Sequence, residues 1–141
     1  MVFFVERYSG HFFVKAILKQ LGTEEWTPRQ VLSAISREKG AGKAMRDYRE
    51  RAENRREQMV ALVWERYEKI LTEEGSLDFD DLLVRTLTLF RESPKILSLL
   101  QNRWHYLTID EYQDTSAVQY EMMKLLCGER SNICVVGDLD Q

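Results

Sequence analysis

The first forty residues alternate apolar and polar positions with a helical period. Residues 11–22, HFFVKAILKQLG, predict a helix that ends at Gly22, because glycine readily takes the left-handed conformation that follows many helices. A second helix is predicted to begin at Thr27, whose hydroxyl can cap it, with Pro28 at its first position and Gly40 at its end. The chain is therefore expected to start with α-helices.

The longest helical pattern spans residues 44–74, and Gly75 is predicted to stop it. Its second half carries an apolar stripe at spacings of three and four residues, interrupted by one arginine. The stripe consists of Met59, Leu62, Val63, Arg66, Tyr67, Ile70 and Leu71. Four aromatic residues are predicted to lie in the core: Trp64, Tyr67, Trp104 and Tyr106.

Two further helices complete a stretch that is expected to be helical throughout, up to about residue 104. The first, within residues 76–93, begins with three acids, Asp78, Asp80 and Asp81. Acids are favoured there because the helix dipole is positive at that end. They resemble a second metal site, but helix capping and packing is the preferred interpretation. Pro94 is predicted to open the next helix.

The pattern changes after residue 104. Residues 105–110 and 132–138 are short apolar runs that end in aspartate, and the amphipathic segment 115–128 lies between them. Strand, helix and strand form a βαβ unit, whose strands are expected to be parallel. Ligands of such sheets bind beyond the carboxyl ends of the strands. The acid-rich segments 110–114 and 138–140 are therefore predicted to lie at one edge.

Carboxylates at the end of an apolar strand are costly to desolvate unless a cation or charged partner compensates them. The strand can deliver Asp110 to a fixed place, where it can hold Mg²⁺ directly or through water. Glu111, expected on the other side of the chain, could orient or deprotonate an attacking water. Gln141 is neutral and can hydrogen-bond a phosphate oxygen. An alternative stays open, in which these acids only cap the following helix, with Asp114 and Thr115 well placed to do so.

Composition excludes several classes of protein. At 141 residues the chain has the length of about one domain, and 44% hydrophobic residues suffice for a core. No apolar run approaches the roughly 18 residues of a membrane span, and the start does not fit a secretory signal. We expect a cytoplasmic protein with no membrane contact, in which Cys127 and Cys134 are reduced core thiols. His11 and His105 lie far apart without a cysteine cluster, so structural zinc is not expected.

Charge is unevenly spread along a chain of net charge −3. Residues 1–75 carry 14 Lys and Arg against 12 Asp and Glu, whereas residues 76–141 carry 6 against 11. The sharpest local excess, from Arg37 to Arg56, has eight basic and four acidic residues. It is either a solvated helix face or a surface that contacts phosphates, and charge alone does not separate the two.

Two motifs carry a resemblance to a known family. LTIDEYQDTS, residues 107–116, resembles the DEXQD form of the Walker B motif in UvrD/Rep-type DNA helicases of superfamily one. VVGDLDQ, residues 135–141, resembles the next motif of that family, in the same order and at a similar spacing. More weakly, residues 27–40 are similar to part of the family's helical insertion, and residues 77–83 to the segment that leads back from it. The resemblance covers roughly residues 15–141.

The resemblance implies a fold class. The expected class is a mostly α-helical chain with a small parallel β piece. Residues 1–76 would form the helical insertion subdomain. Residues 77–141 would form the return helices and a partial RecA-like ATPase core of strand, helix and strand.

The resemblance also implies roles for the motif residues. Asp110 would coordinate Mg²⁺, and Glu111 would be the catalytic acid/base for attack of water on the γ-phosphate of ATP. Gln141 would contact the γ-phosphate and help to couple hydrolysis to strand movement. Gln113 and Asp114 are assigned only a supporting role.

A phosphate-cradling loop, GxxxxGK[ST], is absent from the sequence. The nearest candidate, REKGAGKA, has Arg37 where the first glycine belongs and Ala44 where the hydroxyl belongs, and no strand is predicted before it. The chain is therefore interpreted as an internal helicase fragment that is inactive alone. Its parent is expected to use ATP to move on single-stranded DNA and unwind duplex, for example in DNA repair. In the family the insertion lies near the duplex junction, but the DNA-contacting residues are left unassigned.

Two other functions stay open. The chain could be a stand-alone helical module that binds nucleic acid or protein without catalysis. It could also be a small magnesium-dependent phosphohydrolase that uses Asp110, Asp114 and Asp138, but no phosphate cradle is found near the strand ends. A sheet of few strands is in addition expected to dimerise, non-physiologically, through an exposed edge.

Overall fold

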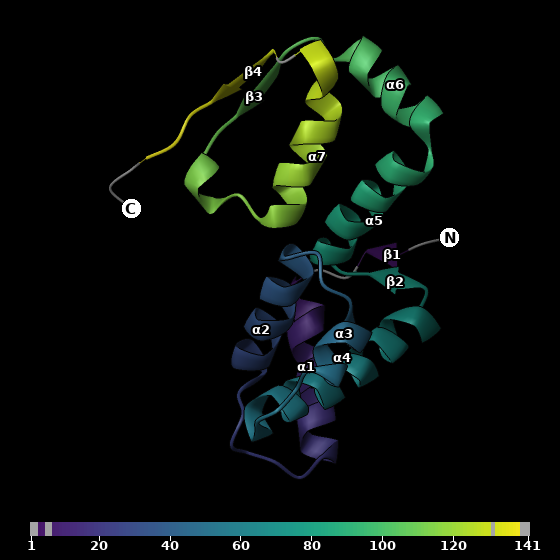
Figure 1. Cartoon of the computed structure of the whole chain (residues 1–141). Coiled ribbons are helices and arrows are strands. Elements are labelled where there is room, and N and C mark those ends of the chain that lie inside the picture. The colour runs from purple at the N-terminus through teal and green to yellow at the C-terminus, as the bar shows by residue number, and fades with distance from the viewer. Residues whose placement is uncertain (1–2, 5–6, 131, 139–141) are drawn as a thin grey trace. The chain divides into compact units, whose positions relative to one another are not determined.

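A computed structural model of the chain describes residues 3–4, 7–130 and 132–138 (Figure 1). The chain divides into two compact units, Met1–Leu82 and Leu83–Gln141. The division falls inside a helix, α5 (Phe79–Glu92). The assignment of residues 1–76 to a helical insertion and of 77–141 to a motor core remains a prediction.

Unit 1 is built from four helices and a short pair of strands. The helices are α1 (Arg7–Gln20), α2 (Pro28–Gly40), α3 (Met45–Glu50) and α4 (Arg55–Glu73). The strands are β1 (Phe3–Phe4) and β2 (Ser76–Leu77), which pair in parallel. The prediction of helices alone before residue 104 was therefore wrong at these two strands.

Local sequence explains where these helices begin and end. Gly22 follows α1 with φ 64°, a conformation that suits glycine. The Thr27 hydroxyl accepts the Gln30 N–H at 3.3 Å, and the Gln30 side chain accepts the Thr27 N–H at 3.0 Å, which is a reciprocal cap. Pro28 occupies the first turn of α2. The predicted stop at Gly22 and the predicted bounds of the second helix are confirmed, whereas α1 begins at Arg7, four residues before the predicted start at His11.

The predicted helix over residues 44–74 is in fact two helices. α3 ends at Glu50, and α4 begins at Arg55. The break has a physical cause in Asn54, whose side chain accepts the Glu57 N–H at 2.9 Å and caps α4. An asparagine that offers its own backbone-like acceptor competes with continuation of the preceding helix.

The core of unit 1 lies between α1, α2 and α4. Its most deeply buried side chains include Val14, Ile17, Val31, Ile35, Val60, Val63, Trp64 and Tyr67. Trp64 and Tyr67 are each 1% exposed, as predicted. The apolar stripe of α4 is rotated from the predicted one, because Val60 and Ala61 are buried while Leu62 is 36% exposed.

Unit 2 contains the βαβ unit. After α5 come α6 (Pro94–Arg103), β3 (Leu107–Ile109), η1 (Tyr112–Asp114), α7 (Ala117–Cys127), η2 (Gly128–Arg130) and β4 (Ile133–Val135). β3 and β4 pair in parallel, with Leu107 opposite Ile133 and Ile109 opposite Val135. The mostly α-helical class with a small parallel β piece is confirmed.

Few side chains of unit 2 are buried. Within its described residues these are Leu87, Phe90, Val118 and Met123. All three residues of β4 are exposed, including Cys134, so the prediction of two core thiols was wrong for this cysteine. Trp104 and Tyr106, predicted as core, are 45% and 81% exposed. A parallel sheet buries its strands only when layers cover both faces, and the described part of unit 2 does not cover β4.

Candidate functional site

The ends of β3 and β4 meet at one rim. The Val136 N–H donates to the Ile109 carbonyl oxygen at 2.8 Å, and the Tyr112 N–H donates to the Val136 carbonyl oxygen at 3.0 Å. We call residues 110–114 and 136–138 the strand-end rim. The predicted juxtaposition of the two acid-rich segments is confirmed as far as Asp138, whereas Leu139, Asp140 and Gln141 lie outside the described residues.

Asp110 and Glu111 stand where β3 stops. The Asp110 Oδ1 atom accepts the Glu111 N–H at 3.0 Å. Glu111 has φ 50°, the left-handed conformation, and among the described residues no other non-glycine has a positive φ. The expectation that Glu111 alternates to the other face of a strand therefore does not apply, since the strand ends at Ile109. Such backbone strain concentrates at functional sites.

Gln113 joins the two halves of the rim. Its Nε2 atom donates to Glu111 Oε2 at 2.6 Å, and its Oε1 atom accepts the Asp138 N–H at 3.0 Å. A Cβ atom on Gly137 would lie 2.7 Å from Gln113 Oε1, so only glycine leaves room for this approach. The sequence suggested a supporting role for Gln113, but not that one amide would hold the Glu111 carboxylate against the end of β4.

Helix capping does not explain these acids. The N-cap of α7 is Ser116, whose hydroxyl accepts the Gln119 N–H at 3.3 Å, while the Gln119 side chain accepts the Ser116 N–H at 2.9 Å. This reciprocal cap leaves no role at the first turn for Asp114 or Thr115. The alternative in which Asp114 and Thr115 cap this helix was therefore wrong.

The rim suits a magnesium ion held by few protein ligands. Asp110 and Glu111 are exposed, and neither forms an ion pair with a described residue. No three acidic, histidine or cysteine side chains converge as a metal cage anywhere in the described ranges. Magnesium needs no such cage, because it keeps several waters and binds one or two carboxylates plus substrate phosphates. The three-carboxylate site of Asp110, Asp114 and Asp138 is not formed.

Comparison with known proteins decides the family. The model of the UvrD/REP helicase N-terminal domain matches residues 9–141. The chain belongs to the UvrD/Rep helicase family. It is 40% identical over 130 residues to the ATP-dependent DNA helicase PcrA of Staphylococcus aureus strain Mu50. The PcrA of Staphylococcus epidermidis strain ATCC 35984 is equally similar. Each match covers 91% of this chain but 18% of the relative, so the chain spans less than a fifth of their length.

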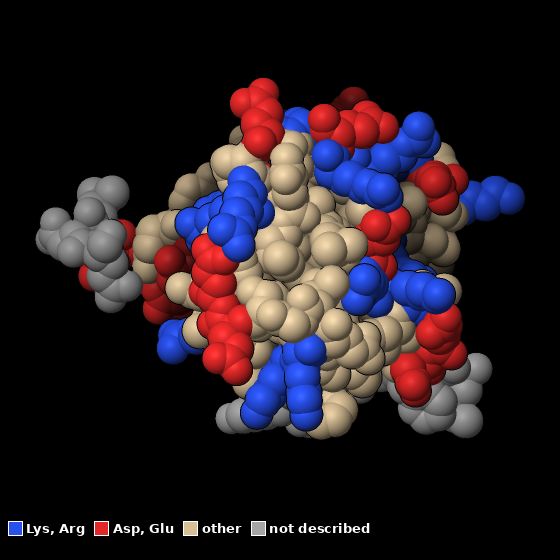
Figure 2. All heavy atoms as spheres, turned by 90° about the horizontal axis from the view of Figure 1, so that it is seen from below, with Lys and Arg blue, Asp and Glu red and all other residues tan. Residues whose placement is uncertain are grey.

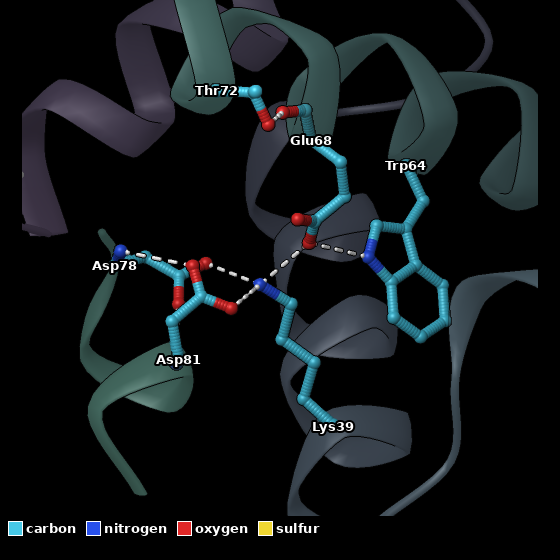
Figure 3. Close-up of polar contacts among 6 residues, drawn as sticks. All are labelled: Lys39, Trp64, Glu68, Thr72, Asp78 and Asp81. Carbon is cyan, nitrogen blue, oxygen red and sulfur yellow. Dashed lines mark hydrogen bonds and ion pairs between the residues drawn. The ribbon is translucent and has the colours of Figure 1, made fainter. Parts of the chain in front are cut away.

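Unit 1 holds a second acid cluster, of a different kind. Three carboxylates surround the Lys39 ammonium in Figure 3: Glu68 at 2.7 Å, Asp78 at 2.9 Å and Asp81 at 2.7 Å from Nζ. Asp78 Oδ1 also accepts the Asp81 N–H at 2.8 Å, and Asp81 Oδ2 accepts the Asp78 N–H at 3.2 Å. The preferred interpretation of Asp78 and Asp81 as capping and packing residues is confirmed.

Electrostatics fix the charge state of this Lys39 cluster. Burial disfavours the Lys39 ammonium, but the charges of Asp78 and Glu68 outweigh it and raise the pKa of Lys39 above its usual range. Burial and the nearby Asp78 charge raise the pKa of Tyr67, which stays a neutral phenol. Burial raises the pKa of Asp81 despite the opposing effect of Lys39. The role of Lys39 could not be predicted from the sequence, because its partners lie 29 to 42 positions away.

The glycine-rich turn after α2 is not a phosphate loop. Gly42 has φ 71°, and the Lys43 N–H donates to the Glu38 carbonyl oxygen at 3.0 Å, which closes the end of the helix. The Lys43 ammonium lies 3.2 Å from Glu38 Oε2. No strand precedes the turn, since α2 runs directly into it. The prediction of an ordinary turn between helices is confirmed.

Much of the basic stretch from Arg37 to Arg56 is paired with acids. Besides Lys39 and Lys43, Arg46 pairs with Glu50 at 3.1 Å and Arg49 with Glu65 at 2.6 Å. On the face shown in Figure 2, basic and acidic groups alternate around a central area of uncharged side chains. The number of basic residues in this stretch therefore overstates the positive charge that is left unpaired at its surface.

Proposed function

We propose that this chain is part of the first motor domain of an ATP-dependent DNA helicase, a protein that hydrolyses ATP to move on single-stranded DNA and separate duplex. The observation that carries the proposal is the strand-end rim, where Gln113 ties Glu111 to the end of β4. Family membership supports it, as does the similarity to the PcrA proteins, which are ATP-dependent DNA helicases. The whole protein would work in the cytoplasm, in DNA repair or a related pathway.

In this proposal each rim residue has a different role in binding or hydrolysing the nucleotide. Asp110 would hold Mg²⁺, directly or through water, and the ion when bound would neutralise charge on the ATP phosphates. Glu111 would accept a proton from the attacking water, in an orientation that Gln113 fixes by its 2.6 Å hydrogen bond. Gln141 would contact the γ-phosphate, and Asp114 would support the motif.

The 141-residue chain itself is proposed to be inactive, since its sequence holds no GxxxxGK[ST] loop. The described helices do not include one that is both long and apolar enough to cross a membrane. The exposed strands of unit 2 would be covered by other parts of the whole protein. In the isolated chain, an edge of this sheet would be free to pair with a second copy.

The test is ATP hydrolysis by a longer protein that contains this chain. Glu111→Gln should lower the turnover number by about 100-fold or more, the usual contribution of general acid/base catalysis, while nucleotide binding is retained. Glu121→Gln is the matched control, because Glu121 lies on α7 and pairs with Arg91 and Lys124 away from the rim. Equal turnover in Glu111→Gln and Glu121→Gln would contradict the proposed role.

A further inference from the structure

Gly137 lies just beyond the end of β4, and its backbone conformation does not require a glycine. Its φ lies outside the left-handed region, in which four other described glycines lie: Gly22, Gly42, Gly75 and Gly128. An alanine could therefore adopt the backbone conformation of Gly137 without strain. What the glycine contributes at this position is the space that it leaves beside the chain.

The end of the Gln113 side chain fills that space. A Cβ atom added to Gly137 would lie 2.7 Å from Gln113 Oε1, and 3.3 Å from the Cβ and N atoms of Tyr112. The first of these distances is too short for two heavy atoms that are not bonded, so one group would have to move. The free end of a side chain moves more easily than backbone does, so an alanine would displace the Gln113 amide.

The backbone beyond β4 is itself fixed to the end of β3. The Val136 N–H donates to the Ile109 carbonyl oxygen at 2.8 Å, and the Tyr112 N–H donates to the Val136 carbonyl oxygen at 3.0 Å. From this fixed segment the Asp138 N–H donates to Gln113 Oε1 at 3.0 Å. The oxygen of the Gln113 amide is therefore held in place by the backbone beyond β4.

The nitrogen of the same amide holds Glu111. Gln113 Nε2 donates to Glu111 Oε2 at 2.6 Å. A side-chain amide is planar, so fixing its oxygen also fixes the direction in which its nitrogen donates. Glu111 depends on such a contact, because its side chain is exposed and its backbone has φ 50°. A left-handed backbone of this kind persists only where the surrounding structure imposes it.

We infer that Gly137 is a positioning residue for Glu111, and that it acts through the Gln113 amide. Gly137 leaves the room, and the Asp138 N–H supplies the hydrogen bond, that together set the orientation of this amide. The inference rests on the proposed function, in which Glu111 accepts a proton from the attacking water. It deepens that function, because it makes the orientation of the Glu111 carboxylate depend on the end of β4.

The test is a double-mutant cycle on ATP turnover by a longer protein that contains this chain. Gly137→Ala should lower the turnover number by about tenfold, because a misplaced base slows the chemical step. KM should change little, since no group that binds the nucleotide is removed. Gln113→Met should lower the turnover number by a similar factor. The double variant should be no slower than Gln113→Met, because the amide that the alanine displaces is already gone.

A second glycine and glutamine of unit 2 provide matched controls. A Cβ atom on Gly128 would lie 2.8 Å from Gln101 Nε2, which donates to the Leu125 carbonyl oxygen at 2.7 Å. This hydrogen bond joins α6 to α7 and not the two strand ends. Gly128→Ala and Gln101→Met should therefore keep the turnover number of the parent. Gly128 has φ 55°, so alanine strains the backbone there, and the control is the harsher change for the fold.

NMR of the 141-residue chain measures the same link without nucleotide. The side-chain amide signals of Gln113 should shift in Gly137→Ala, because the alanine displaces this group. The backbone amide signal of Asp138 should shift in Gln113→Met, which removes its acceptor. Neither signal should move in Gln101→Met. Circular dichroism establishes that each variant is folded.

Three results would overturn the inference. One is a turnover number in Gly137→Ala equal to that of the parent while Glu111→Gln is impaired, in which case the proposed function stands alone. Another is an equal loss from Gly137→Ala with and without Gln113, which would show that the alanine acts by displacing Tyr112. The third is an absence of both NMR shifts. If Glu111→Gln kept full turnover, the proposed function would fail, and NMR would still decide whether Gly137 places the Gln113 amide.

Discussion

Units 1 and 2 contrast in what holds them together. Unit 1 has a closed core between three helices, with Val14, Val31 and Val63 fully buried. Unit 2 buries little, and its strand β4 is exposed along its whole length. The unit with the proposed nucleotide chemistry is thus the one that buries fewer of its own side chains. Stability and chemistry are assigned to different parts of the chain, and each can be perturbed without the other.

The two acid clusters also differ, in whether the chain itself supplies a counter-charge. Asp78 and Asp81 in unit 1 share an internal cation, the ammonium of Lys39, whose side chain is 5% exposed. Asp110 and Glu111 in unit 2 are exposed and have no cation among the described residues. A cluster that carries its own counter-charge is a structural element, whereas one that lacks it is free to take a cation from solution.

The largest expected effect contrasts the tryptophans of the two units. Trp64→Ala should lower the free energy of unfolding by about 3–5 kcal/mol, because it leaves a cavity in the closed core. Trp104→Ala should cost less than about 1 kcal/mol, since Trp104 is 45% exposed. Urea unfolding followed by circular dichroism measures both. Similar losses in the two variants would contradict the contrast between the units.

A smaller but still large effect is expected at the Lys39 cluster. Lys39→Met should destabilise unit 1 by about 3 kcal/mol, because it leaves buried carboxylates without their counter-charge. The control is Lys43→Met, which removes a lysine of 43% side-chain exposure and should cost less than about 1 kcal/mol. The comparison is again by urea unfolding. A Lys39→Met variant as stable as Lys43→Met would show that the cluster contributes nothing to the fold.

The smallest of the three effects is a fall in the free energy of unfolding at alkaline pH. The pKa of Lys39 is raised in the folded state above the unfolded value of about 10.4, so its contribution is complete below that value and is lost as pH rises through the folded pKa. The raised pKa of Tyr67 acts in the same direction, since the unfolded phenol ionises first. Unfolding free energy should fall above about pH 10, by at most about 1.4 kcal/mol per pH unit per proton. Lys39→Met should fall less steeply, and an unchanged slope would contradict this.

Local signals predicted most helix boundaries. Thr27, Pro28 and Gly22 act through their own neighbours, so their effects could be read from the sequence. The parallel pairing of β3 with β4 followed from the βαβ order. The Lys39 cluster could not be predicted, because its ion pairs join residues far apart in the sequence.

The main error of the prediction from sequence was the burial of side chains in unit 2. Short apolar runs suggested buried strands, but burial depends on layers that the described residues do not supply. At the rim, residue types suggested metal and base roles for Asp110 and Glu111. The left-handed backbone of Glu111 and its link through Gln113 to Asp138 are tertiary features that no spacing reveals.

The most direct test of the central claim is a Mn²⁺ titration of the 141-residue chain followed by NMR, with Mn²⁺ in place of Mg²⁺. The account predicts that amide signals of residues 109–114 and 136–138 broaden first, while those of residues 78–81 beside Lys39 do not. It also predicts that Asp110→Asn abolishes the broadening at both strand ends. Broadening that begins at residues 78–81, or that persists unchanged in Asp110→Asn, would contradict a metal-binding rim at the ends of β3 and β4.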